Sequence, residues 1–216
     1  MELLRSTQIV DMIVVRHDAT SEVNDLALQF AALGVPVFDC NEKDMALAAN
    51  TVTPQSILAR VLFHQVKPKG NRVVLLDGVS DPGNVGTIIR CAAWFGFTDV
   101  VLAAKSADVY NPKVVRASAG SMLRMNVHRH VNAEEFISSA PSYSVVSAVP
   151  HGGEPPSILS SLEPLILVIG NEAHGVSANI LSQTNHQVTI PGQGNVESLN
   201  AAMAATILLY EGGRTQ

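Results

Sequence analysis

The sequence is poor in several kinds of residue, and each shortage excludes a class of protein. Only 15% of its 216 residues are charged and 47% are hydrophobic, which excludes a highly charged disordered chain. No run of about 18 apolar residues occurs, so no transmembrane helix is expected. The stretch Met1–Arg5 lacks the basic-then-apolar layout of a signal peptide. The two cysteines, Cys40 and Cys91, favour reduced thiols in the cytoplasm over a disulfide or a metal pair.

The acidic residues outnumber the basic ones, but the two are unevenly distributed. A net charge of −5 argues mildly against a nucleic-acid partner. Residues 60–129, however, carry ten Lys and Arg against four Asp and Glu, whereas the segments on either side are acidic. If these cations share one face, that face would attract a phosphate backbone. A solvated surface without any ligand explains the same pattern.

The pattern of apolar runs and helix caps predicts two units. The first would be a small α/β unit with strands at 10–15 and 35–38 and helices at 21–33 and 42–49. A stretch rich in Lys, Pro and Gly places the domain boundary near residues 65–71. Beyond it, strands are expected at 72–76, 99–103, 125–130, 144–149, 165–169 and 187–190. Helices are expected at 84–95, 111–119, 132–138 and 198–210, with a short one after Ser177.

This alternation predicts a parallel sheet covered by helices on both faces. Loops that follow the carboxyl ends of strands in such sheets form the ligand crevice. Three polar, glycine-containing motifs begin in such loops: Asp81–Arg90, Gly170–Gly175 and Pro191–Asn200. We therefore expect the three motifs to lie in one neighbourhood.

In the first motif, Asn84 stands between Gly83 and Gly86 at the start of a helix. Arg90 follows six residues later, nearly two helical turns, so we expect both side chains to project to broadly similar sides. A simpler interpretation makes Asn84 the helix cap and Arg90 a surface cation. A Rossmann dinucleotide site would need G-x-G-x-x-G, a spacing that Gly78, Gly83 and Gly86 do not have.

The second and third motifs also allow two interpretations each. Glu172 would either brace its loop or face the crevice, and His174 could act as a base or be merely exposed. Ser198 is a natural cap for the last helix. It is a poor candidate for an acyl nucleophile because the G-x-S-x-G pattern is missing. The glycines of the third motif could present backbone groups to a cofactor.

His128 and His130 are two residues apart and so would share one face of a strand. Metal ligation is one interpretation and a pair on the sheet surface is the other. Because no Cys or acidic cluster accompanies them in the sequence, we expect no metal site.

Together and in this order, the three motifs resemble the motif set of the SpoU (TrmH-like) family of RNA 2′-O-ribose methyltransferases, in the SPOUT superfamily. The resemblance spans about Val73 to Glu211. It implies an α/β, parallel-sheet SPOUT fold with a C-terminal trefoil knot, formed by a catalytic domain at residues 66–216. Residues 1–65 are similar to a small L30e-like RNA substrate-binding domain. That domain is expected to be partial, because the family version has a further helix and strand before the equivalent of Val10.

The resemblance also implies transfer of a methyl group from S-adenosylmethionine to a ribose 2′-hydroxyl of RNA. The substrate would be 23S rRNA before tRNA, and the enzyme would be a cytoplasmic homodimer. The implied catalytic residues are Asn84, Arg90, Glu172, Ser198 and Asn200. The implied cofactor contacts are Ala148, Val149, Gly152, Gly170, Ile190 and Leu199.

Within that resemblance we interpret Arg90 as a cation for phosphate and oxyanion, because a guanidinium keeps its proton at neutral pH. Two rival functions remain, a related base methyltransferase and a non-catalytic RNA-binding protein with the same fold. The complete motif set, including Arg90, favours ribose methylation over both.

Overall fold

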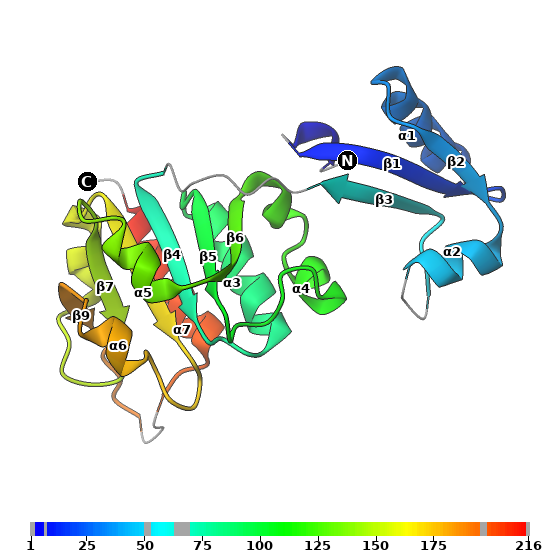
Figure 1. Ribbon diagram of the computed structural model, residues 1–216. Coiled ribbons are helices and arrows are strands. Elements are labelled where there is room, and N and C mark those ends of the chain that lie inside the picture. The colour runs from blue at the N-terminus through cyan, green and yellow to red at the C-terminus, as the bar shows by residue number, and fades with distance from the viewer. Residues whose placement is uncertain (1–2, 7, 50–52, 63–69, 195–197, 215–216) are drawn as a thin grey trace. The chain divides into compact units, whose positions relative to one another are not determined.

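The computed structural model describes residues 3–6, 8–49, 53–62, 70–194 and 198–214 (Figure 1). The chain divides into two compact units, Met1–His64 and Gln65–Gln216, each with its own sheet. Residues 65–69 of the predicted domain boundary lie outside the described residues.

The first unit is a three-stranded sheet in the order β2-β1-β3. Strand β1 (Ile9–Arg16) pairs in parallel with β2 (Val37–Cys40) and antiparallel with β3 (Ile57–Leu62). Its helices are α1 (Ser21–Ala32), α2 (Glu42–Ala49) and a short 3-10 turn at Leu3–Arg5. The sequence did not predict β3, because its residues are only partly buried and show no apolar–polar alternation. One buried cluster of this unit contains Ile13, Val15, Ala27 and Phe30, and Met45 of α2 is also buried.

The second unit is a six-stranded parallel sheet in the order β6-β5-β4-β8-β7-β9, which confirms the predicted parallel α/β fold. The strands are β4 (Arg72–Asp77), β5 (Asp99–Ala103), β6 (Asn126–Val131), β7 (Ser144–Ala148), β8 (Leu165–Gly170) and β9 (His186–Val188). The central strands β4 and β8 are apolar and buried almost throughout, as expected when helices cover both faces.

The α-helices of the second unit are α3 (Pro82–Trp94), α4 (Pro112–Ala117), α5 (Ala133–Ser138), α6 (Ala178–Leu181) and α7 (Ala201–Gly213). Two predicted helix starts are wrong. The cap of α3 is Asp81, whose carboxylate accepts the N–H of Asn84 at 2.9 Å. The cap of α7 is Asn200 rather than Ser198. Both true caps are side chains that reach backbone N–H groups two or three residues ahead.

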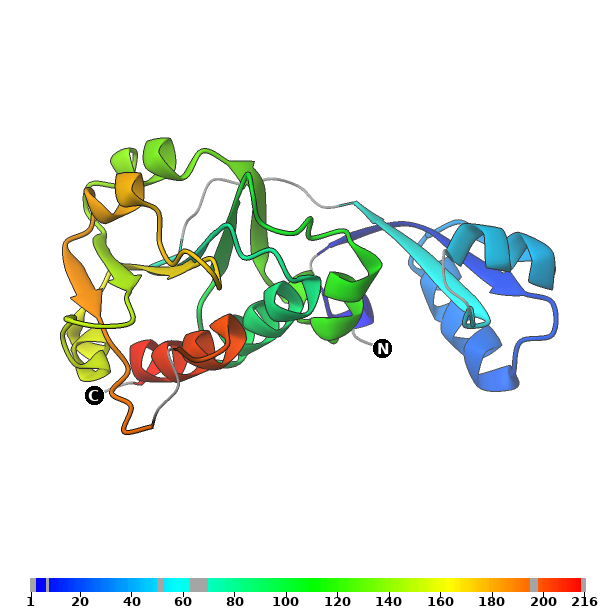
Figure 2. The ribbon, with the colours of Figure 1, turned by 90° about the horizontal axis from the view of Figure 1, so that it is seen from below.

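Helices α3 and α7 lie side by side on one face of the sheet (Figure 2). Cys91 Sγ lies 3.2 Å from Thr206 Oγ1, and the rings of Phe95 and Tyr210 meet edge to face at 5.8 Å. This packing joins the first motif to the C-terminal helix. The trefoil knot that the resemblance implies stays a prediction.

Within the described part of the chain, no helix combines the length and the apolar character needed to cross a membrane.

Candidate functional site

Strands β4, β8, β7 and β9 are consecutive and parallel in the sheet, so their carboxyl ends meet at one edge. The loops that leave this edge contain all three motifs. The second motif is tied to the loop that leads into the first, since Asn171 Nδ2 donates to the carbonyl oxygen of Gly78 at 2.8 Å. The backbone N–H of Ser177 donates to Asp77 Oδ2 at 2.7 Å. The predicted convergence of the motifs therefore has a physical basis in the strand order.

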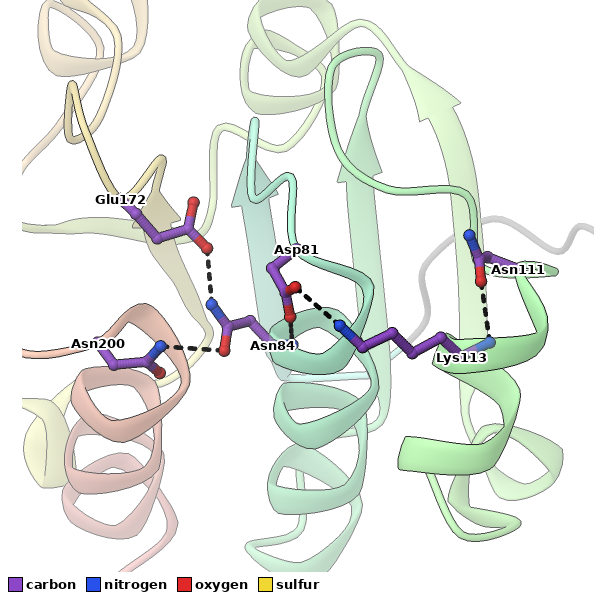
Figure 3. Close-up of polar contacts among 6 residues, drawn as sticks. All are labelled: Asp81, Asn84, Asn111, Lys113, Glu172 and Asn200. Carbon is purple, nitrogen blue, oxygen red and sulfur yellow. Dashed lines mark hydrogen bonds and ion pairs between the residues drawn. The ribbon is translucent and has the colours of Figure 1, made fainter.

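One residue from each motif takes part in a single hydrogen-bonded series (Figure 3). Asn84 Nδ2 donates to Glu172 Oε1 at 2.8 Å, and Asn200 Nδ2 donates to Asn84 Oδ1 at 3.1 Å. Asn84 is half-buried, whereas Glu172 and Asn200 are exposed. Residues separated by 88 and 116 positions in the sequence are thus brought within hydrogen-bond distance.

The contacts of Asn200 at the start of α7 determine which atoms of this series donate and which accept. Asn200 Oδ1 accepts the N–H groups of Ala202 and Met203 at the start of α7. Its Nδ2 is therefore the group left for Asn84, whose carboxamide must present oxygen to Asn200 and nitrogen to Glu172. Each amide thus has one orientation that satisfies all partners. The Glu172–Asn84–Asn200 series is a specific polar contact, and Glu172 braces the first motif rather than only its own loop.

A second polar pair flanks the first motif. Lys113 Nζ lies 3.0 Å from Asp81 Oδ2, and Asn111 caps α4 by accepting the N–H of Lys113 at 2.9 Å. The hydrogen bond from Lys113, followed by that from the N–H of Asn84, holds the pKa of the Asp81 carboxyl below its usual value. The sequence analysis did not identify Asp81 and Lys113 as site residues. An Asp followed by Pro82 is nevertheless a recognisable helix start.

The loops after β7 and β9 are tied to one another. Thr189 Oγ1 accepts the N–H of Gly153 at 2.9 Å and donates to the carbonyl oxygen of Val149 at 3.1 Å. Gly152 has a φ of +79°, and a Cβ built there, or on Gly192, would meet no atom within 4 Å. These two loops therefore lie together and leave stretches of backbone open.

The predicted cofactor residues all lie at or beside this edge of the sheet. Ala148, Val149 and Ile190 are half-buried, and Leu199 is 47% exposed. Position 170 requires glycine for a structural reason, because a Cβ there would lie 2.2 Å from the carbonyl carbon of Gly175. That close approach is made by the turn in which Asn171 and Gly175 exchange backbone hydrogen bonds.

Comparisons with known proteins agree with this geometry. The model of the SpoU rRNA Methylase family matches residues 71–210. The chain belongs to this family. The resemblance predicted from the motifs is confirmed.

Among its SpoU-family relatives, a Bacillus subtilis protein is 35% identical over 214 residues, which cover 97% of this chain and 83% of the relative. It is named 23S rRNA (guanosine(2553)-2′-O)-methyltransferase RlmP. A Synechocystis protein, named an uncharacterized tRNA/rRNA methyltransferase, is 32% identical over 88% of this chain and 72% of its own length. The solved structure of an AdoMet-bound rRNA methyltransferase from Sinorhizobium meliloti superposes with a TM-score of 0.82 at 28% identity. The match covers 98% of this chain and 82% of that one.

Arg90, the cation of the first motif, takes no part in the Glu172–Asn84–Asn200 series among the described residues. It is exposed on α3, and its side chain makes no hydrogen bond or ion pair with any described residue. The expectation that it projects to the same side as Asn84 is wrong. In a continuous α-helix, six residues correspond to about 120° around the axis and about 9 Å along it.

Ser198 is exposed and irregular in structure, shortly before the α7 cap. Its side chain forms no hydrogen bond with the described residues. The prediction that it caps the last helix is wrong, because Asn200 is the cap. His174 is exposed, and its backbone N–H, like that of Ala173, is held by Asn171 Oδ1. The turn thus orients the backbone at His174 and leaves its side chain outside the Glu172–Asn84–Asn200 series.

His128 and His130 do not form the expected pair on one strand face. His128 is buried, and its Nε2 lies 2.9 Å from Asp99 Oδ1. His130 is exposed with a φ of +53°, where the pairing of β6 with β5 shifts register. The irregularity breaks the two-residue alternation on which the prediction relied. Among the residues that the structure describes, no three His, Cys, Asp or Glu side chains are grouped closely enough to hold a metal ion.

Proposed function

We propose that this SpoU-family chain transfers a methyl group from S-adenosylmethionine to a ribose 2′-hydroxyl of RNA, with 23S rRNA as the favoured substrate. The observation that carries the proposal is the Glu172–Asn84–Asn200 series, which unites one residue of each motif. The names of the Bacillus relative and of the Sinorhizobium structure support the reaction and the cofactor. The name of the Synechocystis relative makes tRNA the second candidate.

The residues of the loops after β7 and β9 fit the proposed cofactor chemically. Val149, Ile190 and Leu199 offer apolar surface suited to an adenine ring. The open backbone at Gly152 and Gly192 offers N–H and C=O groups to the ribose and the amino-acid part. When bound, S-adenosylmethionine supplies an electrophilic methyl group on a sulfonium sulfur. The remaining proposed contacts are Ala148 and Gly170.

Transfer forms a bond between the 2′-oxygen and the methyl carbon and breaks the bond from that carbon to sulfur. The hydroxyl proton passes to water, and S-adenosylhomocysteine is left as a neutral thioether. We assign Arg90 to hold a substrate phosphate and to stabilise the negative charge that develops on the 2′-oxygen. Asn84, Glu172 and Asn200 hold the three loops in fixed positions relative to one another. Ser198 borders the ribose. Such alignment lowers the barrier by fixing the reacting atoms about 3 Å apart.

We further propose that the protein is a homodimer that pairs through α3 and α7. Met203, Ile207 and Tyr210 recur along one side of α7, and they are 63%, 39% and 50% exposed. Trp94 on the neighbouring α3 is 84% exposed, and Arg90 lies one turn before it on the same side. A contiguous apolar surface of this kind is typical of an interface between proteins. We propose that in this dimer Arg90 of one subunit serves the Glu172–Asn84–Asn200 series of the other.

The first unit, residues 1–65, is proposed to act as a partial L30e-like RNA substrate-binding domain. Its mixed sheet and two helices are compatible with that role. Because rRNA is the favoured substrate, the proposed location is the cytoplasm.

Methyl transfer from tritium-labelled S-adenosylmethionine to purified 23S rRNA, followed by nucleoside analysis, tests the proposal. The label should appear in a 2′-O-methylated nucleoside. Labelled tRNA in place of rRNA would favour the second candidate. A labelled base would refute the ribose assignment, and cofactor binding without any labelled RNA would indicate a binding protein.

A further inference from the structure

We propose that a basic face, formed by Lys105, Tyr110, Lys113, Arg116 and Arg129, binds the single-stranded RNA next to the methylated nucleotide, an inference that rests on the proposed function. These residues belong to the loop after β5, to α4 and to β6. The occupant is RNA in single-stranded form because the face combines cations with an exposed aromatic ring.

The charge of this face is opposite to that of the whole protein. The face holds four cations, of which Lys113 and Arg129 lie near Asp81 and Asp108, in a chain whose net charge is −5. Lys105 and Arg116 are exposed, and neither side chain forms a hydrogen bond or an ion pair with any described residue. An acidic protein needs such a local concentration of cations to hold a polyanion, because phosphate contacts supply most of the affinity for RNA.

The basic face begins directly at the candidate site. The Cβ atoms of Lys105 and Asn171 each lie 3.8 Å from the position that a Cβ on Gly78 would take, so Lys105 is beside the second motif. Lys113 reaches across to Asp81, the cap of the helix that carries Asn84 (Figure 3). RNA bound on this face would therefore lie next to the Glu172–Asn84–Asn200 series.

Tyr110 and Arg129 form a stacking platform on the same face. The guanidinium carbon of Arg129 lies 4.7 Å from the centre of the Tyr110 ring, and Asp108 Oδ2 lies 3.8 Å from Arg129 Nη1. Tyr110 as a residue nevertheless remains 43% exposed to solvent. Nucleic-acid bases stack on exposed aromatic rings and on guanidinium planes. The arrangement offers one base-stacking position between phosphate-binding cations.

The experiment measures binding of a fluorescein-labelled oligouridylate, about 16 nucleotides long to match the upper end of single-strand site sizes, at several salt concentrations with the full chain. The variants are Tyr110→Ala, Tyr110→Phe and the double variant Lys105→Ala/Arg116→Ala. Arg72→Ala is the matched control, since it removes a cation at the opposite, amino-terminal edge of the sheet, where Arg72 pairs with Glu163 at 3.6 Å. Circular dichroism verifies that each variant is folded.

The two kinds of contact give different signatures. Removing two phosphate-binding cations should reduce the slope of log K against log salt by about 1.4, since each contact contributes about 0.7 for single strands. Tyr110→Ala should weaken binding about fivefold or more with an unchanged slope, whereas Tyr110→Phe keeps the ring and binds normally. Arg72→Ala should behave as wild type.

Wild-type affinity and slope in both the double variant and Tyr110→Ala would overturn the inference, as would failure of the wild-type protein to bind the oligouridylate. In either case, retained methylation of 23S rRNA would show that the proposed function stands without this face. Loss of both binding and methylation by the wild-type protein would refute the two proposals together. Tighter binding of a double-stranded RNA of equal length would refute the choice of occupant.

Discussion

Asn84 Nδ2 lies 2.8 Å from Glu172 Oε1, so the carboxylate of the second motif holds the asparagine of the first motif. The same carboxamide accepts a hydrogen bond from Asn200 of the third motif. Because Asn84 must donate on one side and accept on the other, no carboxylate replaces it without loss of a contact. The polar series explains why these three residues belong together chemically.

Asn84→Asp should therefore abolish the contact with Glu172, because two carboxylates would then face each other without a donor. Hydrogen bonds to charged groups contribute about 1.5–3 kcal/mol, so methyl transfer should fall about tenfold or more. Adding Glu172→Gln should restore a large part of the activity, since the introduced glutamine amide can donate to the introduced aspartate carboxylate. Steady-state transfer assays of the two single variants and the double variant check this. Equal activity of Asn84→Asp and the double variant would contradict the series.

Asn200 serves the helix and the site with different atoms, and substitutions should separate the two roles. Asn200→Asp keeps an oxygen for the N–H groups of Ala202 and Met203 but loses the donor to Asn84. It should retain the thermal midpoint and lose methyl transfer. Asn200→Ala should lose both, with about 0.5–2 kcal/mol of stability from the missing cap. Thermal unfolding measures the capping role and methyl-transfer assays measure the role in the site. Full activity of Asn200→Asp would show that the side-chain amide group is dispensable.

Arg90 should act across the proposed dimer interface. Arg90→Ala and Asn200→Ala should each be inactive alone, yet their mixture, after subunit exchange, should recover up to about a quarter of wild-type activity, as expected for randomly assorted dimers. The recovery arises because one site of each mixed dimer has both residues intact. Arg90→Lys should remain impaired, because an ammonium lacks the planar fork of a guanidinium. A mixture as inactive as its components, with dimers verified by light scattering, would place Arg90 in the site of its own chain.

The buried pair Asp99–His128 should govern stability in acid. Burial raises the pKa of the Asp99 carboxyl, but hydrogen bonds from His128 and Thr98 outweigh it, so the pKa lies below its usual value. A carboxyl with a lowered folded-state pKa contributes stability above its unfolded value of about 3.9, and that contribution disappears as pH falls through the folded pKa.

Asp99→Asn should lower the stability of the second unit at neutral pH by about 1.5–3 kcal/mol, and it should lose less stability than wild type below about pH 4. Thermal midpoints between about pH 3 and 7, followed by circular dichroism, measure both effects. Glu163→Gln is the control, because its carboxylate is half-exposed and pairs with Arg72 at 3.6 Å. Parallel curves for wild type and Asp99→Asn over the acid range would exclude this role.

Much of the second unit could be predicted from the sequence because its signals are local. The strand at residues 99–103 has the predicted bounds, and Asn111 caps its helix as expected. Caps depend on hydrogen bonds within three residues, and buried parallel strands are continuous apolar runs. The three motifs were sufficient to predict the family, because each falls at the junction between a strand and the following loop or helix.

The contacts that make the site were decided only by the tertiary structure. The strand order brings Asn84, Glu172 and Asn200 together, and no local pattern reveals which of their atoms donate. The shifted register of β6, which separates His128 from His130, depends on pairing with β5. The sequence determined which segments become strands and helices, since those choices follow from nearby residues. The separation of Arg90 from Asn84 is a local consequence of their spacing on α3. The basic face, in contrast, depends on how the loop after β5, α4 and β6 pack together.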